Sequence, residues 1–338
     1  MKPWLPIAFV GVLITAPALA QDTRPESAPA AVTIQYENDM IGAATDKHYT
    51  SGVRASFVAD PSWGWVYDSA KWVSKFMPEA FTGKDPVMTY TASLGQSLYT
   101  PEDIRETNVI TDDRPYAGWT YGTVGAVADD WKSDTLHQIS LDVGFIGPFS
   151  LGEETQTFVH KVIDSPKPKG WDHQLKTELG LQLNYGVQKR FGTETGLPFF
   201  DEIDVVPHAT FALGNVFTYG AMGGTVRIGT GLDVDYGPPR IRPSLPGSGL
   251  VRKRDVAGFY LFAGLEGRGV ARNIFLDGNT FAESHDVKRI PWVTDAQAGI
   301  AATYGPVRAS FTYIWRSPEF EGQRGGDQFS AFSVSYLF

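Results

Sequence analysis

The sequence predicts an all-β fold, namely a transmembrane antiparallel β-barrel of about twelve strands with short helices in its loops. Three features predict this fold class. The N-terminus has the pattern of an exported protein, apolar and polar residues alternate along most of the chain, and the last strand ends in an aromatic residue.

The first twenty residues have the pattern of a cleaved signal peptide. Lys2 supplies a positive charge, residues 7–16 form an apolar run, and Ala18-Leu19-Ala20 has the small-x-small form of a cleavage site. The run is too short to anchor the chain in a membrane as a helix. The predicted divisions are a signal peptide over 1–20, a flexible leader over 21–30 and an outer-membrane β-barrel over 31–338.

Alternation with a period of two predicts strands that have one apolar and one polar face. Within Glu178–Gln188, the odd-numbered positions from Leu179 to Val187 are apolar, and the even-numbered positions carry Glu, Gly, Gln and Asn. In a membrane barrel the apolar face meets lipid and the polar face lines the lumen. The expected strands are 31–37, 49–59, 87–99, 117–129, 135–146, 178–191, 202–214, 219–232, 258–270, 287–301, 307–316 and 328–338.

The last expected strand carries a further signal. Phe332, Val334, Tyr336 and Phe338 share one face, and Phe338 is the final residue. This resembles the C-terminal signature of bacterial outer-membrane barrels, which the barrel assembly machinery reads. It predicts a cell outer membrane location and that machinery as a partner.

Composition narrows the classes of partner. The formal net charge is −9 at pH 7, which argues against nucleic acid because such a partner needs a basic face. The chain has no cysteine, so no disulfide framework is expected. In the lumen, the long side chains of Arg54, Gln182 and Arg308 are expected to fill the space.

Two segments have helical spacing. Apolar residues recur from Val66 to Met77, which predicts a packing helix without chemistry. A second helix is expected from Glu153 to Ile163, opened by a capping box between Ser150 and Glu153. Gln156 and His160, four residues apart, then share one face of that helix.

The densest polar groups lie in connections that follow odd-numbered strands. With a periplasmic N-terminus these connections are all on the outer side, and neighbouring strands bring them together at one rim. The segments are 38–48, 100–116 and 147–177.

Each polar group has two interpretations. Asn38, Asp39 and Thr50 offer oxygen ligands that suit Ca²⁺, but an Asn-Asp pair at a strand end also forms ordinary turns. His160 can be a general base or a surface histidine near a helix C-terminus. No G-x-S-x-G motif supports a serine nucleophile.

At these residues the chain resembles the outer-membrane lipid A 3′-O-deacylase family. The resemblance spans nearly the whole predicted mature chain. The motifs that carry it are E-N-D at Glu37–Asp39, Y-T-S-G at Tyr49–Gly52, D-R-P-Y-A-G at Asp113–Gly118, G-F-I-G-P at Gly144–Pro148, and Q-x-x-x-H at Gln156 and His160.

The resemblance implies a Ca²⁺-dependent hydrolase that removes the 3′-linked acyloxyacyl chain of lipid A, in lipopolysaccharide of the outer leaflet. The family's proposed mechanism is similar to that of secreted phospholipase A2. It implies that His160 activates water, that Asn38, Asp39 and Thr50 form the metal site, and that Gln156 belongs to the catalytic group.

The family also has a Lys in its second outer loop, where an ungapped reading of this chain places Glu106. Substrate binding is therefore expected to involve Arg105 beside it, together with Arg114 and Tyr116. Arg114-Pro115-Tyr116 can also simply open a strand, with Pro at its start. Two alternative functions remain open, an outer-membrane phospholipase A and a passive pore or structural barrel.

Overall fold

The computed structural model describes residues 30–39, 47–78, 86–243 and 257–338. The predicted signal peptide and nearly all of the predicted leader lie outside these residues. The described strands are β1 Ala31–Asn38, β2 His48–Val58, β3 Val87–Thr100, β4 Ala117–Asp130, β5 Thr135–Ile146, β6 Glu178–Lys189, β7 Phe191–Leu197, β8 Phe200–Gly214, β9 Phe217–Thr230, β10 Gly258–Asn273, β11 Trp292–Tyr304, β12 Val307–Arg316 and β13 Asp327–Leu337. The described helices are α2 Trp65–Ser74, α3 Gly152–Ile163 and α4 Ile274–Asp277, with 3₁₀ turns η1 Pro61–Trp63, η2 Pro148–Ser150, η3 Trp171–His173 and η4 Leu232–Val234.

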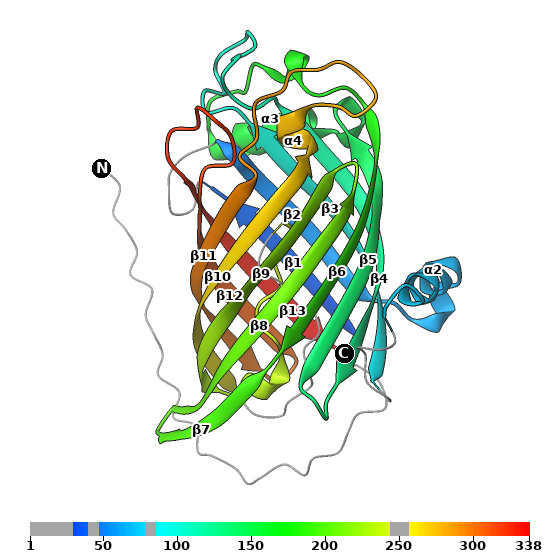
Figure 1. Ribbon diagram of the computed structural model, residues 1–338, viewed down its shortest axis with the longest axis vertical. Helices are drawn as coiled ribbons and strands as arrows, with labels where there is room; N and C mark the ends of the chain where they lie inside the picture. The colour runs from blue at the N-terminus through cyan, green and yellow to red at the C-terminus, as the bar shows by residue number, and fades with distance from the viewer. Residues whose placement is uncertain (1–29, 40–46, 79–85, 244–256) are drawn as a thin grey trace.

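Antiparallel pairing closes these strands into a barrel. Consecutive strands pair along the wall, β1 pairs with β13, and β6 pairs with β8. β7 pairs only with β8 and projects from one end, so the part of the chain described here forms a twelve-strand wall, as the sequence predicts (Figure 1). We call the end with β7 the base and the end with α3 and α4 the rim.

The wall has its apolar residues outside and its polar residues inside. In β6, Leu179 and Leu181 are each 48% exposed, whereas Gln182 and Asn184 are buried. A soluble protein shows the opposite arrangement, so this pattern fits a lipid-facing barrel. The face that Phe332 to Phe338 form in the last strand is also exposed. None of the helices in the described segments has the length and apolarity needed to cross a membrane.

The lumen is filled by buried ion pairs. Asp295 accepts from Arg268 and Arg316 at 2.9 and 2.8 Å, and Arg308 pairs with Asp235 at 2.6 Å. Of the three predicted lumen side chains, Gln182 and Arg308 are buried and Arg54 is half-buried. These pairs occupy space that a passive pore would need.

One strand begins later than its alternation predicts. We expected a strand over 287–301, whereas β11 is Trp292–Tyr304. Pro291 has no N–H to donate to a ladder, and the preceding Arg289 forms only an isolated bridge with Phe320.

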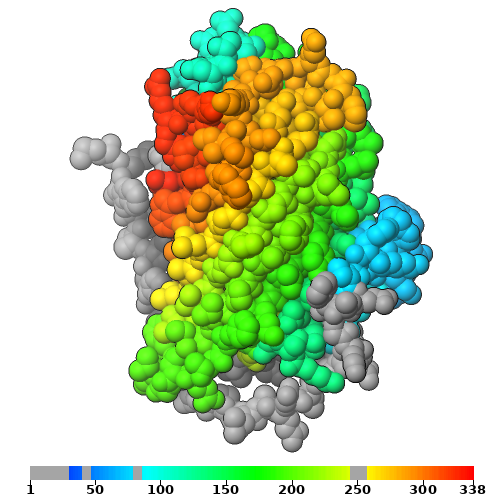
Figure 2. Space-filling view, viewed as in Figure 1, coloured from blue at the N-terminus to red at the C-terminus, as the bar shows by residue number. Residues whose placement is uncertain are grey.

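The two predicted helices are present. α2 packs on the outside of the wall near the base, with Val73 and Met77 against Ala126 and Ala128 of β4, and it stands out from the wall in Figure 2. α3 matches its predicted span, but the predicted capping box is wrong. Ser150 lies in the preceding 3₁₀ turn, where its hydroxyl donates to the Gly147 carbonyl at 2.6 Å.

Candidate functional site

Three predicted site residues meet where β1 and β2 reach the rim. The Asn38 side-chain amide donates to the Thr50 carbonyl at 3.0 Å, and the Asp39 backbone N–H lies 3.4 Å from the same oxygen. The Lys47 backbone N–H donates to Asp39 Oδ2 at 2.6 Å. All three predicted residues are buried, so the strand ends hold a compact set of oxygen groups.

A β-bulge places Thr50. The register between β2 and β3 shifts between Tyr49 and Ser51, which leaves Thr50 as the extra residue. Bulges of this kind re-aim a side chain at the edge of regular pairing. The Thr50 hydroxyl thereby lies 2.7 Å from the Thr100 hydroxyl at the end of β3.

Helix α3 contributes the second group. Its buried residues are Gly152, Gln156 and His160, spaced four apart on one face, as expected for Gln156 and His160. The helix packs closely against β4, because a Cβ on Gly118 would lie 3.0 Å from Gly152 Cα. Two glycines in contact therefore let the buried face of α3 approach the wall.

The ring of His160 is oriented by its own loop. Its Nδ1 lies 2.6 Å from the Pro166 carbonyl, which can only accept, so Nδ1 carries the proton. In the neutral ring Nε2 then holds the lone pair that a general base requires. The chain returns to this position because Asp164 adopts the left-handed conformation and Ser165 N–H donates to the His160 carbonyl.

Gln156 is held by a residue that the sequence analysis missed. Trp171 Nε1 donates to Gln156 Oε1 at 2.8 Å, and both side chains are buried. Trp171 also packs in one cluster with Leu98 of β3 and with Tyr116. The η3 turn that carries Trp171 has no periodic pattern in the sequence from which this contact could be predicted.

One residue of each group, Thr50 and Trp171, contacts the outer face of β3. Leu98 and Thr100 are two residues apart on β3 and share a face, while Tyr99 between them points inward and packs in a cluster of buried apolar residues. Thr100 contacts Thr50 of the first group, and Leu98 contacts Trp171 of the second. α3 and Thr50 thus lie on the same face of the wall.

Loop contacts confirm that the predicted polar segments gather at one rim. His48 Nδ1 lies 2.6 Å from Asp327, and His48 Nε2 lies 3.6 Å from Asp113.

Burial alone would raise the pKa of Asp113. Hydrogen bonds from His48 and from the backbone N–H groups of Glu102 and Arg114 outweigh it and hold the pKa below its usual value.

The residues assigned to substrate binding occupy different environments. Arg105 is exposed and pairs with Asp103 at 3.2 Å in its own loop. Arg114 is buried, pairs with Glu319 at 3.1 Å and lies over the Tyr99 ring. The Tyr116 hydroxyl donates to the Ile104 carbonyl at 3.1 Å.

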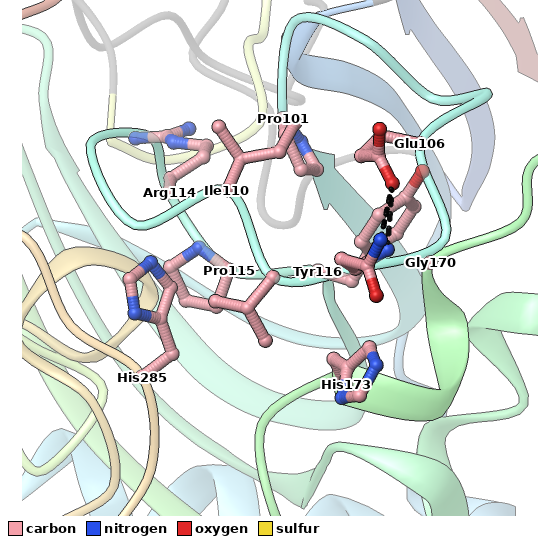
Figure 3. A pocket seen from close by; sticks show the side chains of 11 residues that line it. Pro101, Glu106, Ile110, Arg114, Pro115, Tyr116, Gly170, His173 and His285 are labelled. Atoms are coloured by element: carbon pink, nitrogen blue, oxygen red, sulfur yellow. Dashed lines mark hydrogen bonds between the residues drawn. The ribbon is translucent and has the colours of Figure 1, made fainter.

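Arg114 and Tyr116 also line a small hollow of the rim, with Glu106, His173 and His285 on its walls (Figure 3). The Glu106 carboxylate accepts hydrogen bonds from Asn108 and Thr107, which lower its pKa. It is therefore ionised and held by its own loop, at the position where the resembled family has a Lys.

Fold and candidate residues together define a class of protein, a membrane β-barrel with a buried histidine on a rim helix that packs against its outer wall. A family model described as outer membrane protein LpxR matches residues 7–338. The chain belongs to this family, and it is an outer-membrane β-barrel.

A solved structure shows the same fold. LpxR from Salmonella typhimurium superposes with a TM-score of 0.74 at 19% identity, over 91% of this chain and 100% of that one. The β domain of the Bordetella autotransporter BrkA is more distant, with a TM-score of 0.43 at 12% identity over 93% and 100% of the two chains. No curated protein matches the chain by sequence.

Proposed function

We propose that this protein is a Ca²⁺-dependent lipid A 3′-O-deacylase, with His160 as the base that activates water. The observation that carries the proposal is the orientation of His160. Its Nδ1 proton is bound by the Pro166 carbonyl at 2.6 Å, and the ring is buried beside Gln156 on the face of α3 that meets the wall.

The proposed reaction needs no serine nucleophile. His160 Nε2 takes a proton from water as that water attacks the ester carbonyl at the 3′ position. The bond from the carbonyl carbon to the 3′ oxygen breaks and the protonated His160 returns its proton to that oxygen, which releases the acyloxyacyl chain as a free acid and leaves a 3′-hydroxyl on lipid A. General-base catalysis of this kind contributes about 10²–10⁴-fold.

The donor set near the rim suits a hard cation. Asp39 and Asn38 supply a carboxylate and an amide oxygen, and Thr50 supplies a hydroxyl and a carbonyl. In the described parts of the chain, no three His, Asp or Glu side chains group as metal ligands, so Ca²⁺ here would rely on neutral oxygens beside Asp39. Bound Ca²⁺ supplies positive charge that polarises the ester carbonyl.

The surroundings of the site suit a lipid substrate. Phe149, Leu151, Phe158 and Val162, on and just before α3, are each more than half exposed. These apolar side chains stand beside the buried polar group on the outer wall, where they can contact acyl chains. An ester buried in the lipid leaflet would therefore meet Gln156 and His160 without entering the lumen.

The test is mass spectrometry of lipid A from cells that express the wild-type protein, His160→Ala or Lys161→Ala. We expect loss of the 3′-linked acyloxyacyl chain with the wild type and with Lys161→Ala, because Lys161 is exposed on the same helix. We expect none above background with His160→Ala. Purified protein should lose activity with a chelator and regain it with Ca²⁺.

Heat modifiability on gels must show that each barrel is folded. Unchanged lipid A with a folded wild-type barrel would refute the proposal. Release of fatty acid from glycerophospholipid in the same assay would then support a phospholipase A instead. Full activity of His160→Ala would remove its role as the base.

A further inference from the structure

The connection after β9 enters the lumen from the base. Asp235 lies between two arginines near the base end of the wall, with Arg227 Nη1 and Arg308 Nη2 each 2.6 Å from its carboxylate. The Tyr260 hydroxyl donates to the same carboxylate at 3.0 Å. Residues 235–241 are all buried, so this segment is packed inside the barrel.

The same segment reaches the rim half of the lumen. Arg316 Nη2 donates to the Pro243 carbonyl at 2.8 Å. Arg308 and Arg316 lie at opposite ends of β12, eight residues apart, which corresponds to about 26 Å of strand. The stretch from Asp235 to Pro243 therefore runs beside most of the length of that strand. We call residues 235–243 the lumen segment.

Arg240 of the lumen segment binds the E-N-D motif from inside. Its Nε and Nη2 lie 2.6 and 3.3 Å from the two carboxylate oxygens of Glu37, and the Ile241 backbone N–H donates to Glu37 at 3.0 Å. Arg240 Nη1 also donates to Gln297 at 3.2 Å. A bidentate contact of this kind pairs the two charges and also fixes the relative position of the two side chains.

Ile241 packs against the Y-T-S-G motif at Tyr49–Gly52. A Cβ on Gly52, the last residue of Y-T-S-G, would lie 2.9 Å from Ile241 Cδ1 and closer still to the Tyr49 hydroxyl. Gly52 pairs with Glu37 across β1 and β2. The lumen segment therefore contacts neighbouring points on both strands that carry the first group of the candidate site.

We propose that Arg240, carried into the lumen by the lumen segment, is a positioning residue for the candidate site. Glu37 points into the lumen, while Asn38 next to it belongs to the opposite face of the strand. The ion pair inside the barrel thereby holds the strand end from which Asn38 faces outward and which Asp39 directly follows. The catalytic part of this inference rests on the function proposed above.

The first test is hydrogen–deuterium exchange of the full chain in detergent, comparing wild type, Arg240→Met and Arg190→Met. Arg190→Met is the matched control, because it removes an arginine that pairs with Asp134 at the base. We expect faster exchange in peptides covering 31–39 and 47–53 for Arg240→Met alone. Unchanged exchange there in a folded Arg240→Met barrel would overturn the proposal.

The second test measures deacylation kinetics. A site displaced by a lost support typically loses on the order of 10²-fold in rate, so kcat should fall while KM changes little. Arg240→Lys should recover part of this loss because it keeps the charge. If Arg240→Met does not fold, Glu37→Gln breaks the same pair with less change of shape, and unchanged exchange in that variant would equally refute the proposal.

The two tests separate the two proposals. A wild-type protein without deacylase activity would refute the proposed function, and the exchange data would still decide whether Arg240 holds the strand end. A fall in activity with unchanged exchange would count against Arg240 as a positioning residue. Faster exchange together with a lower kcat is the result that supports it.

Discussion

At the scale of single residues, the indole of Trp171 decides how Gln156 is presented. The bond from Trp171 Nε1 to Gln156 Oε1 is 2.8 Å and buried. Trp171→Phe keeps a ring against Leu98 but leaves the amide oxygen without that donor, which costs about 1–3 kcal/mol. We expect kcat for lipid A deacylation to fall with little change in KM, as measured with purified protein in detergent micelles.

The matching control is Trp131→Phe, which changes an indole in the turn between β4 and β5, away from α3. Equal kcat values for Trp171→Phe and wild type would show that Gln156 does not depend on this bond.

The roles of single residues could be predicted from the sequence only in part. The spacing of Gln156 and His160 placed both on one helix face, but Trp171 reaches Gln156 from the short η3 turn, whose position no periodicity predicts.

At the scale of elements, the docking of α3 depends on the absence of a side chain at Gly118. A Cβ there would lie 2.1 Å from the Ser150 hydroxyl and 3.0 Å from Gly152 Cα. Gly118→Val should push α3 from the wall and lower deacylation by at least about tenfold, because small displacements of catalytic groups are costly. The barrel should remain heat-modifiable, since the paired strands do not need α3.

Gly267→Val is the control for this prediction. Gly267 is also a strand glycine on the outer face, and a Cβ there meets nothing within 4 Å. Activity of Gly118→Val equal to that of Gly267→Val would show that close packing of α3 is unnecessary. Tryptic cleavage within α3, compared between the two variants, reports the displacement directly.

Elements were the most predictable scale, because alternation and helical spacing are local properties. The wall strands appear close to their expected positions, and both helices are present. The wrong predictions lie where a neighbouring residue or turn overrides the local pattern. β11 begins only after Pro291, and Ser150 lies in a 3₁₀ turn instead of capping α3. β7 was not expected, because it extends a hairpin beyond the wall and its residues are mostly exposed.

At the scale of the whole molecule, the lumen holds the contacts that the sequence could not predict. Glu37 and Arg240 are 203 positions apart, and Arg114 and Glu319 are 205 apart. Alternation predicts that such side chains point inward, but only the barrel's register and the path of the lumen segment decide which charges meet. The strand that leads to Asn38 and the loop that carries Arg114 thus contact partners from the far half of the chain.

Asp295 tests how much the filled lumen contributes to stability. It is fully buried and accepts hydrogen bonds from both Arg268 and Arg316. Asp295→Asn leaves two buried guanidinium groups without their shared counter-charge, which should cost about 3–5 kcal/mol. Glu321→Gln breaks an exposed pair with Lys288 and should cost little. Urea unfolding in lipid vesicles, followed by tryptophan fluorescence, compares the two. A clearly lower midpoint for Asp295→Asn alone means that the ion pairs hold the wall together from within, whereas equal midpoints would assign barrel stability to the strand ladder and its lipid-facing side chains.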